Sequence, residues 1–146
     1  MRGTALRALM LALVMLGLAS TSLAGEDGAF VVIANPENPV EAIDRDFLRD
    51  AYLKKATEWS DGETIRPVDL VAKYPARDRF NEQVLHKTPA QLKTYWNQQI
   101  FSGKGVPPPE AESPAGVIQY VLANKGAVGY IPADVDPGKA KAIQVR

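Results

Sequence analysis

The most informative stretches of this chain read Thr-Glu-Trp-Ser-Asp-Gly-Glu-Thr-Ile-Arg-Pro at residues 57–67 and Ala-Asn-Lys-Gly-Ala-Val-Gly-Tyr-Ile-Pro at residues 123–132. In the first stretch, an Asp-Gly pair predicts a tight turn, which leads into a strand over residues 65–71. In the second, a glycine after a helical pattern predicts a helix end, and the apolar run 127–131 predicts a strand. Each stretch therefore supplies one strand to the expected fold.

Upstream of both stretches, residues 30–34 form the apolar, β-rich run Phe-Val-Val-Ile-Ala. A continuous apolar run is typical of a strand that is buried on both faces of a mostly parallel sheet. Two prolines within residues 35–39 predict a loop after this strand, because proline removes a donor and extends the residue before it. At the other end of the chain, residues 143–145 predict a short edge strand.

Helices are predicted between these strands. The first follows Asp44, and the second starts at about Pro75. The third has the clearest start signal, because Thr88 can cap it, a proline tolerates the first helical position and Gln91 can close a capping box. Its apolar residues, all expected to be buried, are Leu92, Tyr95, Trp96 and Ile100. Ser113 opens a fourth helix, so the pattern indicates an α/β fold with helices packed on a short sheet.

The first 24 residues have the pattern of a secretory signal peptide. Arg2 and Arg7 precede and border an apolar run at residues 8–18, and small residues follow up to Ala24. The alternative is a membrane anchor, but the run is shorter than the ~20 residues that cross a bilayer. We therefore expect a signal peptide at residues 1–24 and one periplasmic or secreted domain at residues 25–146.

The amino-acid composition limits which covalent links could stabilise or anchor the chain and which partners it could bind. The sequence has no cysteine, so disulfides and lipid attachment through cysteine are excluded. Loss of Arg2 and Arg7 would lower Lys and Arg from 17 to 15 against 17 Asp and Glu, which gives the mature chain a charge near −2. Because no basic excess is present to neutralise phosphates along a backbone, we do not expect nucleic acid as a partner.

Residues that could carry catalysis are scarce. His86 is the only histidine, so a multi-histidine metal site is excluded and a Ser-His-Asp triad would depend on this residue alone. Its place at a predicted helix end favours a structural interpretation. Asp44, Asp46 and Asp50 lack the spacing of a calcium loop and fit a helix start. We expect no enzymatic activity, no metal and no cofactor.

The junction at residues 71–79 is the best candidate for ligand binding. A predicted strand gives way to a predicted helix there, and helix starts at strand ends commonly bind anions. Lys73, Arg77 and Arg79 add positive charge. The alternative is a solvated surface on which Asp78 neutralises one of the arginines, and the sequence leaves both interpretations open.

Five short motifs, in this order, resemble the second lobe of periplasmic phosphate-binding proteins. The matching segments are Tyr-Leu-Lys-Lys at 52–55 with Trp-Ser-Asp-Gly at 59–62, Pro-Val at 67–68, Arg-Asp-Arg-Phe at 77–80, Phe-Ser-Gly at 101–103, and Gly-Ala-Val-Gly-Tyr at 126–130. The similarity covers about residues 31–132. It is greater still to the short, stand-alone secreted members labelled phosphate ABC transporter substrate-binding proteins.

The resemblance implies a type 2 periplasmic-binding-protein-like domain of one lobe that binds solutes and is not an enzyme. Together with the charged junction at residues 71–79, it points to Arg77 and the amides of Ala76 and Arg77 as anion donors, with Lys73 as an auxiliary charge. Asn35, at the end of the first predicted strand, would add a further polar contact. The implied partners are inorganic phosphate or another small anion, and a periplasmic or membrane transporter protein. The chain departs from the family at residues 74–76, where Tyr-Pro-Ala replaces the Ser-Gly-Thr that holds the anion.

A second interpretation belongs to a different functional class. In it, the chain is a periplasmic interaction module that kept the lobe and lost the ligand. The proline loop at residues 107–109 and the aromatic residues near it would then form the contact surface. An acid that occupies Arg77 would favour this interpretation, whereas Arg77 and Lys73 converging on an open concavity would favour solute binding.

Overall fold

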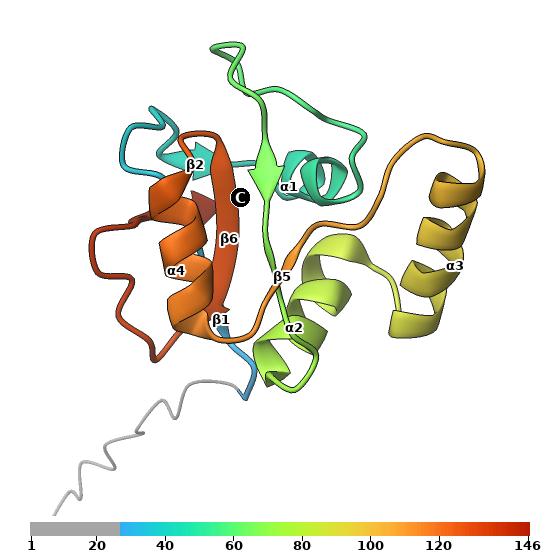
Figure 1. Cartoon of the computed structure of the whole chain (residues 1–146). Coiled ribbons are helices and arrows are strands. Elements are labelled where there is room, and N and C mark those ends of the chain that lie inside the picture. The colour runs from blue at the N-terminus through green and yellow to red at the C-terminus, as the bar shows by residue number, and fades with distance from the viewer. Residues whose placement is uncertain (1–26) are drawn as a thin grey trace, which may run out of the picture.

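The computed structural model describes residues 27–146 (Figure 1). The predicted signal peptide, residues 1–24, lies outside this part of the chain. The centre is a five-stranded sheet in the order β2-β7-β1-β6-β3. Its strands are β1 (Phe30–Ala34), β2 (Ala42–Ile43), β3 (Arg66–Pro67), β6 (Ala127–Pro132) and β7 (Lys141–Val145).

The α/β fold class is confirmed, but the sheet is mixed and not mostly parallel. The central strand β1 pairs antiparallel with both β6 and β7, while β3 runs parallel to β6 and β2 parallel to β7. The apolar run in β1 reflects its central, buried position, which does not specify strand direction. β7 is also an interior strand, between β2 and β1, and not the predicted edge strand.

Helices cover both faces of the sheet. The helical elements of the described residues are α1 (Arg45–Tyr52), α2 (Pro75–Phe80), the π-helical segment η1 (Asn81–Leu85) that continues α2, α3 (Pro89–Phe101) and α4 (Pro114–Ala123). On β6, a Cβ at Gly129 would meet Val117 and Val121 of α4, whereas the next residue, Tyr130, stacks on Phe80 of α2 with 4.0 Å between ring centroids. Successive strand residues face opposite sides, so α4 covers one face and α2 the other.

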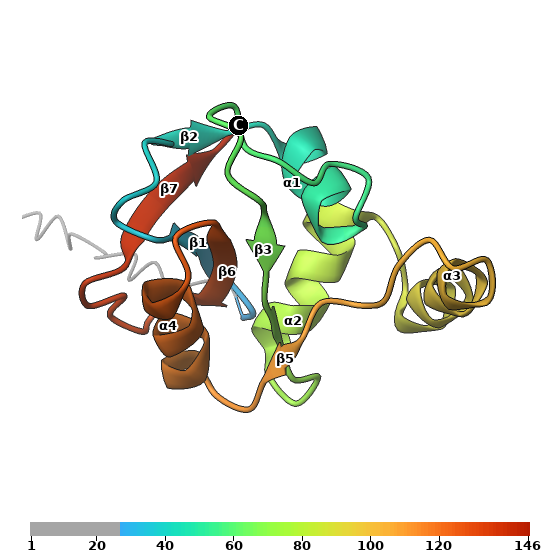
Figure 2. The same cartoon turned by 45° about the horizontal axis from the view of Figure 1, so that its top comes forward.

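The helix α3 begins as the sequence predicts but ends differently. The Thr88 hydroxyl accepts a hydrogen bond from the Gln91 amide, and the Gln91 side chain accepts one from the Thr88 amide, which completes the capping box. Figures 1 and 2 show α3 at the side of the molecule, away from the main sheet. Leu92 is buried, but Ile100, predicted to be buried, is 52% exposed because the end of α3 extends beyond the body.

The predicted strand at residues 65–71 is split between two sheets. The Val68 amide still bonds to Val128 of β6 at 2.9 Å, whereas the Asp69 amide bonds to the Pro109 carbonyl at 2.8 Å. Residues Asp69–Leu70 form β4, which pairs in parallel with β5 (Glu110–Ala111). This change of partner brings Asp69 opposite Glu110.

The two most informative stretches of the sequence meet at Gly126. Its carbonyl accepts hydrogen bonds from the Trp59 indole and the Arg66 amide, both at 2.9 Å. A Cβ at Gly126 would lie 1.8 Å from the Thr64 carbonyl oxygen. This glycine therefore allows two backbone segments to approach closely, whereas α4 already ends at Ala123.

Candidate functional site

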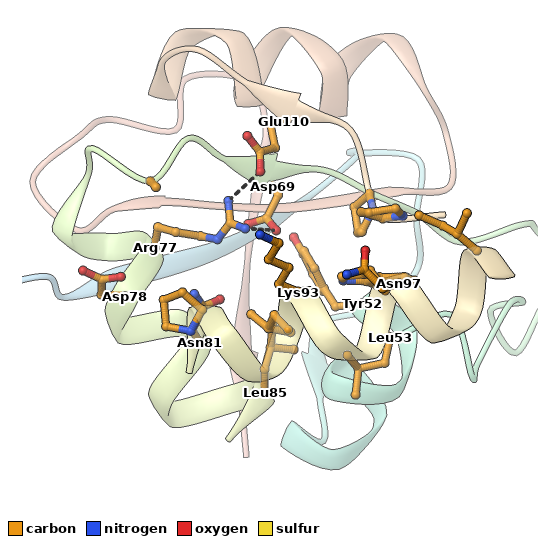
Figure 3. A pocket seen from close by; sticks show the side chains of 17 residues that line it. Tyr52, Leu53, Asp69, Arg77, Asp78, Asn81, Leu85, Lys93, Asn97 and Glu110 are labelled. Atoms are coloured by element: carbon orange, nitrogen blue, oxygen red, sulfur yellow. Dashed lines mark hydrogen bonds and ion pairs between the residues drawn. The ribbon is translucent and has the colours of Figure 1, made fainter. Parts of the chain in front are cut away.

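Arg77 lies on α2, and its guanidinium points toward β4 and β5 (Figure 3). It donates to the Leu70 carbonyl at 2.6 Å, and it pairs with Asp69 at 3.2 Å and with Glu110 at 3.3 Å. Its side chain is only 15% exposed. The guanidinium of Arg77, which the sequence predicted as an anion donor, is thus already bonded to two carboxylates and one carbonyl.

Asp69 is the buried partner of this arginine. Its side chain is 8% exposed, and one carboxylate oxygen accepts hydrogen bonds from the Tyr130 hydroxyl and from the Leu70 amide. Burial raises the pKa of the Asp69 carboxyl, and the Arg77 guanidinium opposes that rise. Burial also raises the pKa of Tyr130 well above its usual range, so its hydroxyl remains a hydrogen-bond donor. We therefore interpret Asp69, Arg77 and Tyr130 as a network that holds β4 against α2.

The other predicted donors lie at the start of α2. Ala76 is buried, and the Arg77 amide already donates to the Tyr74 carbonyl at 2.9 Å. Lys73 is exposed and places its ammonium 5.3 Å from the centre of the Tyr74 ring. The start of α2 borders a hollow of about 500 Å³, whose described lining includes Asp27 and Asp134 but no basic residue. The formal charge of this hollow is therefore unfavourable for an anion.

Asn35 has different neighbours from those of Arg77. Its side-chain amide donates to the carbonyls of Val121 and Leu122, at 3.0 and 3.3 Å, near the end of α4. Its oxygen accepts a hydrogen bond from the Glu37 amide at 2.9 Å. These bonds tie the end of β1 to α4, so Asn35 has a structural role in this geometry.

A second pocket, of about 320 Å³, lies between the α2–η1 segment and α3. Figure 3 shows Arg77 and Asn81 on one side of it and Lys93 and Asn97, from α3, on another. Asn81 is 4% exposed, and its side-chain oxygen is buried without a hydrogen-bond partner. The Arg77 Nε atom is likewise buried without a partner.

Sequence reasoning missed Asp69, Glu110 and Asn81. One signal was available for Asp69, because a carboxylate inside the apolar run 68–71 needs a partner of opposite charge. No comparable signal marks Glu110, since its proximity to Arg77 depends on the pairing of β4 with β5.

Within residues 27–146, no group of three or more His, Cys, Asp or Glu side chains is placed to hold a metal ion. No helix in the same range is long and apolar enough to cross a membrane.

Comparison with solved structures identifies the fold. A Clostridium perfringens protein described as a phosphate ABC transporter substrate-binding protein, solved with bound phosphate, is 22% identical with a TM-score of 0.62. An ABC-type phosphate transport receptor from Vibrio cholerae is 24% identical with a TM-score of 0.63. PstS from Borrelia burgdorferi is 13% identical with a TM-score of 0.62. No protein-family model and no curated protein matches the sequence.

The chain has the fold of a single α/β lobe that resembles part of PstS. The matches cover 81% to 82% of this chain but only 47% to 48% of those proteins, so the chain spans about half their length. The predicted resemblance is thereby confirmed at the level of the fold. The Clostridium and Vibrio proteins are a substrate-binding protein and a transport receptor, respectively.

Proposed function

We propose that this chain is a periplasmic interaction lobe, which docks on a protein partner and does not bind phosphate through Arg77. Two observations disfavour anion binding. Arg77 is paired with Asp69 and Glu110, and an incoming anion would have to compete with both carboxylates in a partly buried site. The hollow beside the start of α2 has an acidic lining instead of a basic one.

The observation that carries the proposal is an exposed apolar surface at the end of α3. We call Ile100, Phe101 and Val106 the apolar tip. Their exposed fractions are 52%, 96% and 61%. All three lie within residues 100–106, at the end of α3 and in the segment that follows it. We propose that they form one interaction surface, because water contact with exposed apolar groups costs free energy that a partner removes. The tip adjoins the proline loop at residues 107–109, which the sequence indicated as a contact surface.

The chemistry of the tip limits the partner. Lys104 lies between Phe101 and Val106 in the sequence and is exposed. A complementary partner would offer an apolar pocket for the Phe101 ring with an acidic group at its rim. We therefore expect a protein partner in the same compartment, such as a transport component.

Site-specific photocrosslinking in the cell that makes the protein tests this function. With a photoreactive phenylalanine analogue at position 101, we expect one discrete crosslinked adduct, because Phe101 would be buried in the partner. The same analogue at exposed Lys139 serves as the control and should give no such adduct. Excess unlabelled protein should suppress the adduct, whereas excess Phe101→Ser should not. An adduct of equal yield from both positions, or none from position 101, would contradict the proposal.

A further inference from the structure

A hollow of about 310 Å³ lies over the main sheet, where β1 begins and β7 ends. Val32 of β1 is paired with Ile143 of β7, and both side chains are buried. Residues two apart on a strand face the same side, so Phe30 and Val145, which also line the hollow, extend this apolar surface. Two neighbouring strands therefore give the hollow an apolar floor.

Helical segments supply the rest of the lining. Arg79 comes from α2, Gln83 and Val84 come from η1, and Arg45 is the first residue of α1. The segment η1 is π-helical, and π-helical turns are frequent at functional sites. The hollow is thus bounded by the sheet on one side and by polar residues of two helical segments on others.

The charge of this hollow is positive. Arg45 and Arg79 are the charged residues among the described residues that line it, and neither forms an ion pair with a carboxylate in residues 27–146. Arg79 donates a hydrogen bond to the Asp27 carbonyl at 2.8 Å, which leaves other guanidinium N–H groups for a ligand. Arg45 is exposed and Arg79 is half-buried, so solvent reaches both residues.

The combination of positive charge and an apolar floor selects the kind of anion. Unlike Arg77, which is paired with Asp69 and Glu110, these two arginines could accept an anion without displacing a carboxylate of the described chain. Phosphate is polar on every side and would lose hydration against the floor without gaining partners there. A carboxylate with an apolar body matches both parts, because arginine pairs well with carboxylate and the body covers apolar surface.

We propose that this hollow binds a small monocarboxylate with a short aliphatic body. The carboxylate accepts hydrogen bonds from the guanidinium groups of Arg45 and Arg79, and the body lies on the apolar floor of β1 and β7. The volume of about 310 Å³ is close to the lower end of the range for small-molecule sites, which suits a ligand of this size. The lining includes neither Arg77 nor any residue of the apolar tip, so the site stands or falls independently of the proposed docking function.

The test is an NMR titration of the purified mature protein, at low ionic strength, with hexanoate, hexanamide, acetate and inorganic phosphate. We expect hexanoate to shift the backbone amide signals of Val32, Val84 and Ile143 in a saturable way. A Kd on the order of 1 mM is reasonable for a probe with so few atoms. Hexanamide lacks the charge and acetate lacks the apolar body, so each should bind at least about tenfold more weakly. Phosphate should leave these signals unshifted.

Charge-neutralising variants make the result specific. Arg45→Gln combined with Arg79→Gln should weaken hexanoate binding by about tenfold or more, while the affinity for hexanamide stays the same. Arg45→Gln alone, at an exposed position that should spare the fold, is expected to weaken hexanoate binding by about threefold. The control combines Arg66→Gln with Lys139→Gln, two exposed residues that do not line the hollow. It changes the net charge equally and should leave hexanoate binding nearly unchanged.

Three results would overturn the proposal. The first is the absence of saturable shifts with hexanoate in the unmodified protein. The second is equal binding of hexanamide or of acetate, since the site would then not require both the charge and the apolar body. The third is a control pair that weakens hexanoate binding as much as the Arg45 and Arg79 pair does, because the effect would then come from net charge alone.

Discussion

Replacing Asp69 with alanine is expected to lower the free energy of unfolding by about 3–5 kcal/mol, the usual cost of removing one partner from a buried ion pair. The variant would leave Arg77 with Glu110, which is 52% exposed, and would remove the acceptor of the Tyr130 hydroxyl. Because domains of this size are stable by about 5–15 kcal/mol, this loss is a large fraction of the total. Urea unfolding followed by circular dichroism at neutral pH measures it.

Two further substitutions separate charge from hydrogen bonding. Asp78→Ala removes an exposed carboxylate from the same junction and should change the free energy of unfolding by no more than about 1 kcal/mol. Asp69→Asn retains an acceptor for Tyr130 but not the charge opposite Arg77, so it should fall between the two alanine variants. If Asp69→Ala were no more destabilising than Asp78→Ala, the structural role of this ion pair would be refuted.

Gly126→Ala is expected to destabilise the protein by about 3 kcal/mol, at the upper end of the usual cost of overpacking. The added Cβ would lie 1.8 Å from the Thr64 carbonyl oxygen, which is a backbone atom and cannot move alone. Separation of these segments would also strain the hydrogen bonds that Gly126 accepts from Trp59 and Arg66. In urea unfolding followed by tryptophan fluorescence, we expect the transition to occur at a lower urea concentration than in the unmodified protein, which would report the weakened packing around Trp59.

Gly105→Ala is the matched control. The nearest atom to its added Cβ is Lys54 Cβ at 4.0 Å, which is an ordinary contact distance. We expect its unfolding midpoint to lie close to that of the unmodified protein. Equal midpoints for the two glycine variants would show that the close approach at Gly126 is not needed for stability.

Local sequence signals predicted the helices well, because the information lies within each segment. The capping box at Thr88 and Gln91 is present as expected, and the apolar run at residues 30–34 is a buried strand. Strand direction was not predictable in the same way. The antiparallel pairing of β1 depends on the direction in which the distant segments β6 and β7 run beside it. An apolar run indicates that a strand is buried, but it does not indicate the direction of its neighbours.

At the candidate site, too, the sequence could not predict contacts that depend on distant segments. The sequence marked Arg77 as a charged residue near a helix start, but it could not show which way the guanidinium points. That direction depends on β4 leaving the main sheet to pair with β5, which brings Asp69 and Glu110 to the arginine. Likewise, Ile100 continues the apolar pattern of α3, yet only the position of the helix at the side of the molecule leaves it exposed.

We infer that Arg77 serves the fold and not a bound anion. Calorimetric titration of the mature protein with inorganic phosphate at low ionic strength tests it most directly, with Lys73→Ala as the variant because that lysine is exposed and its loss should spare the fold. We expect no saturable heat from either protein. Saturable heat that is lost in Lys73→Ala would contradict the claim and restore the predicted anion site at the start of α2.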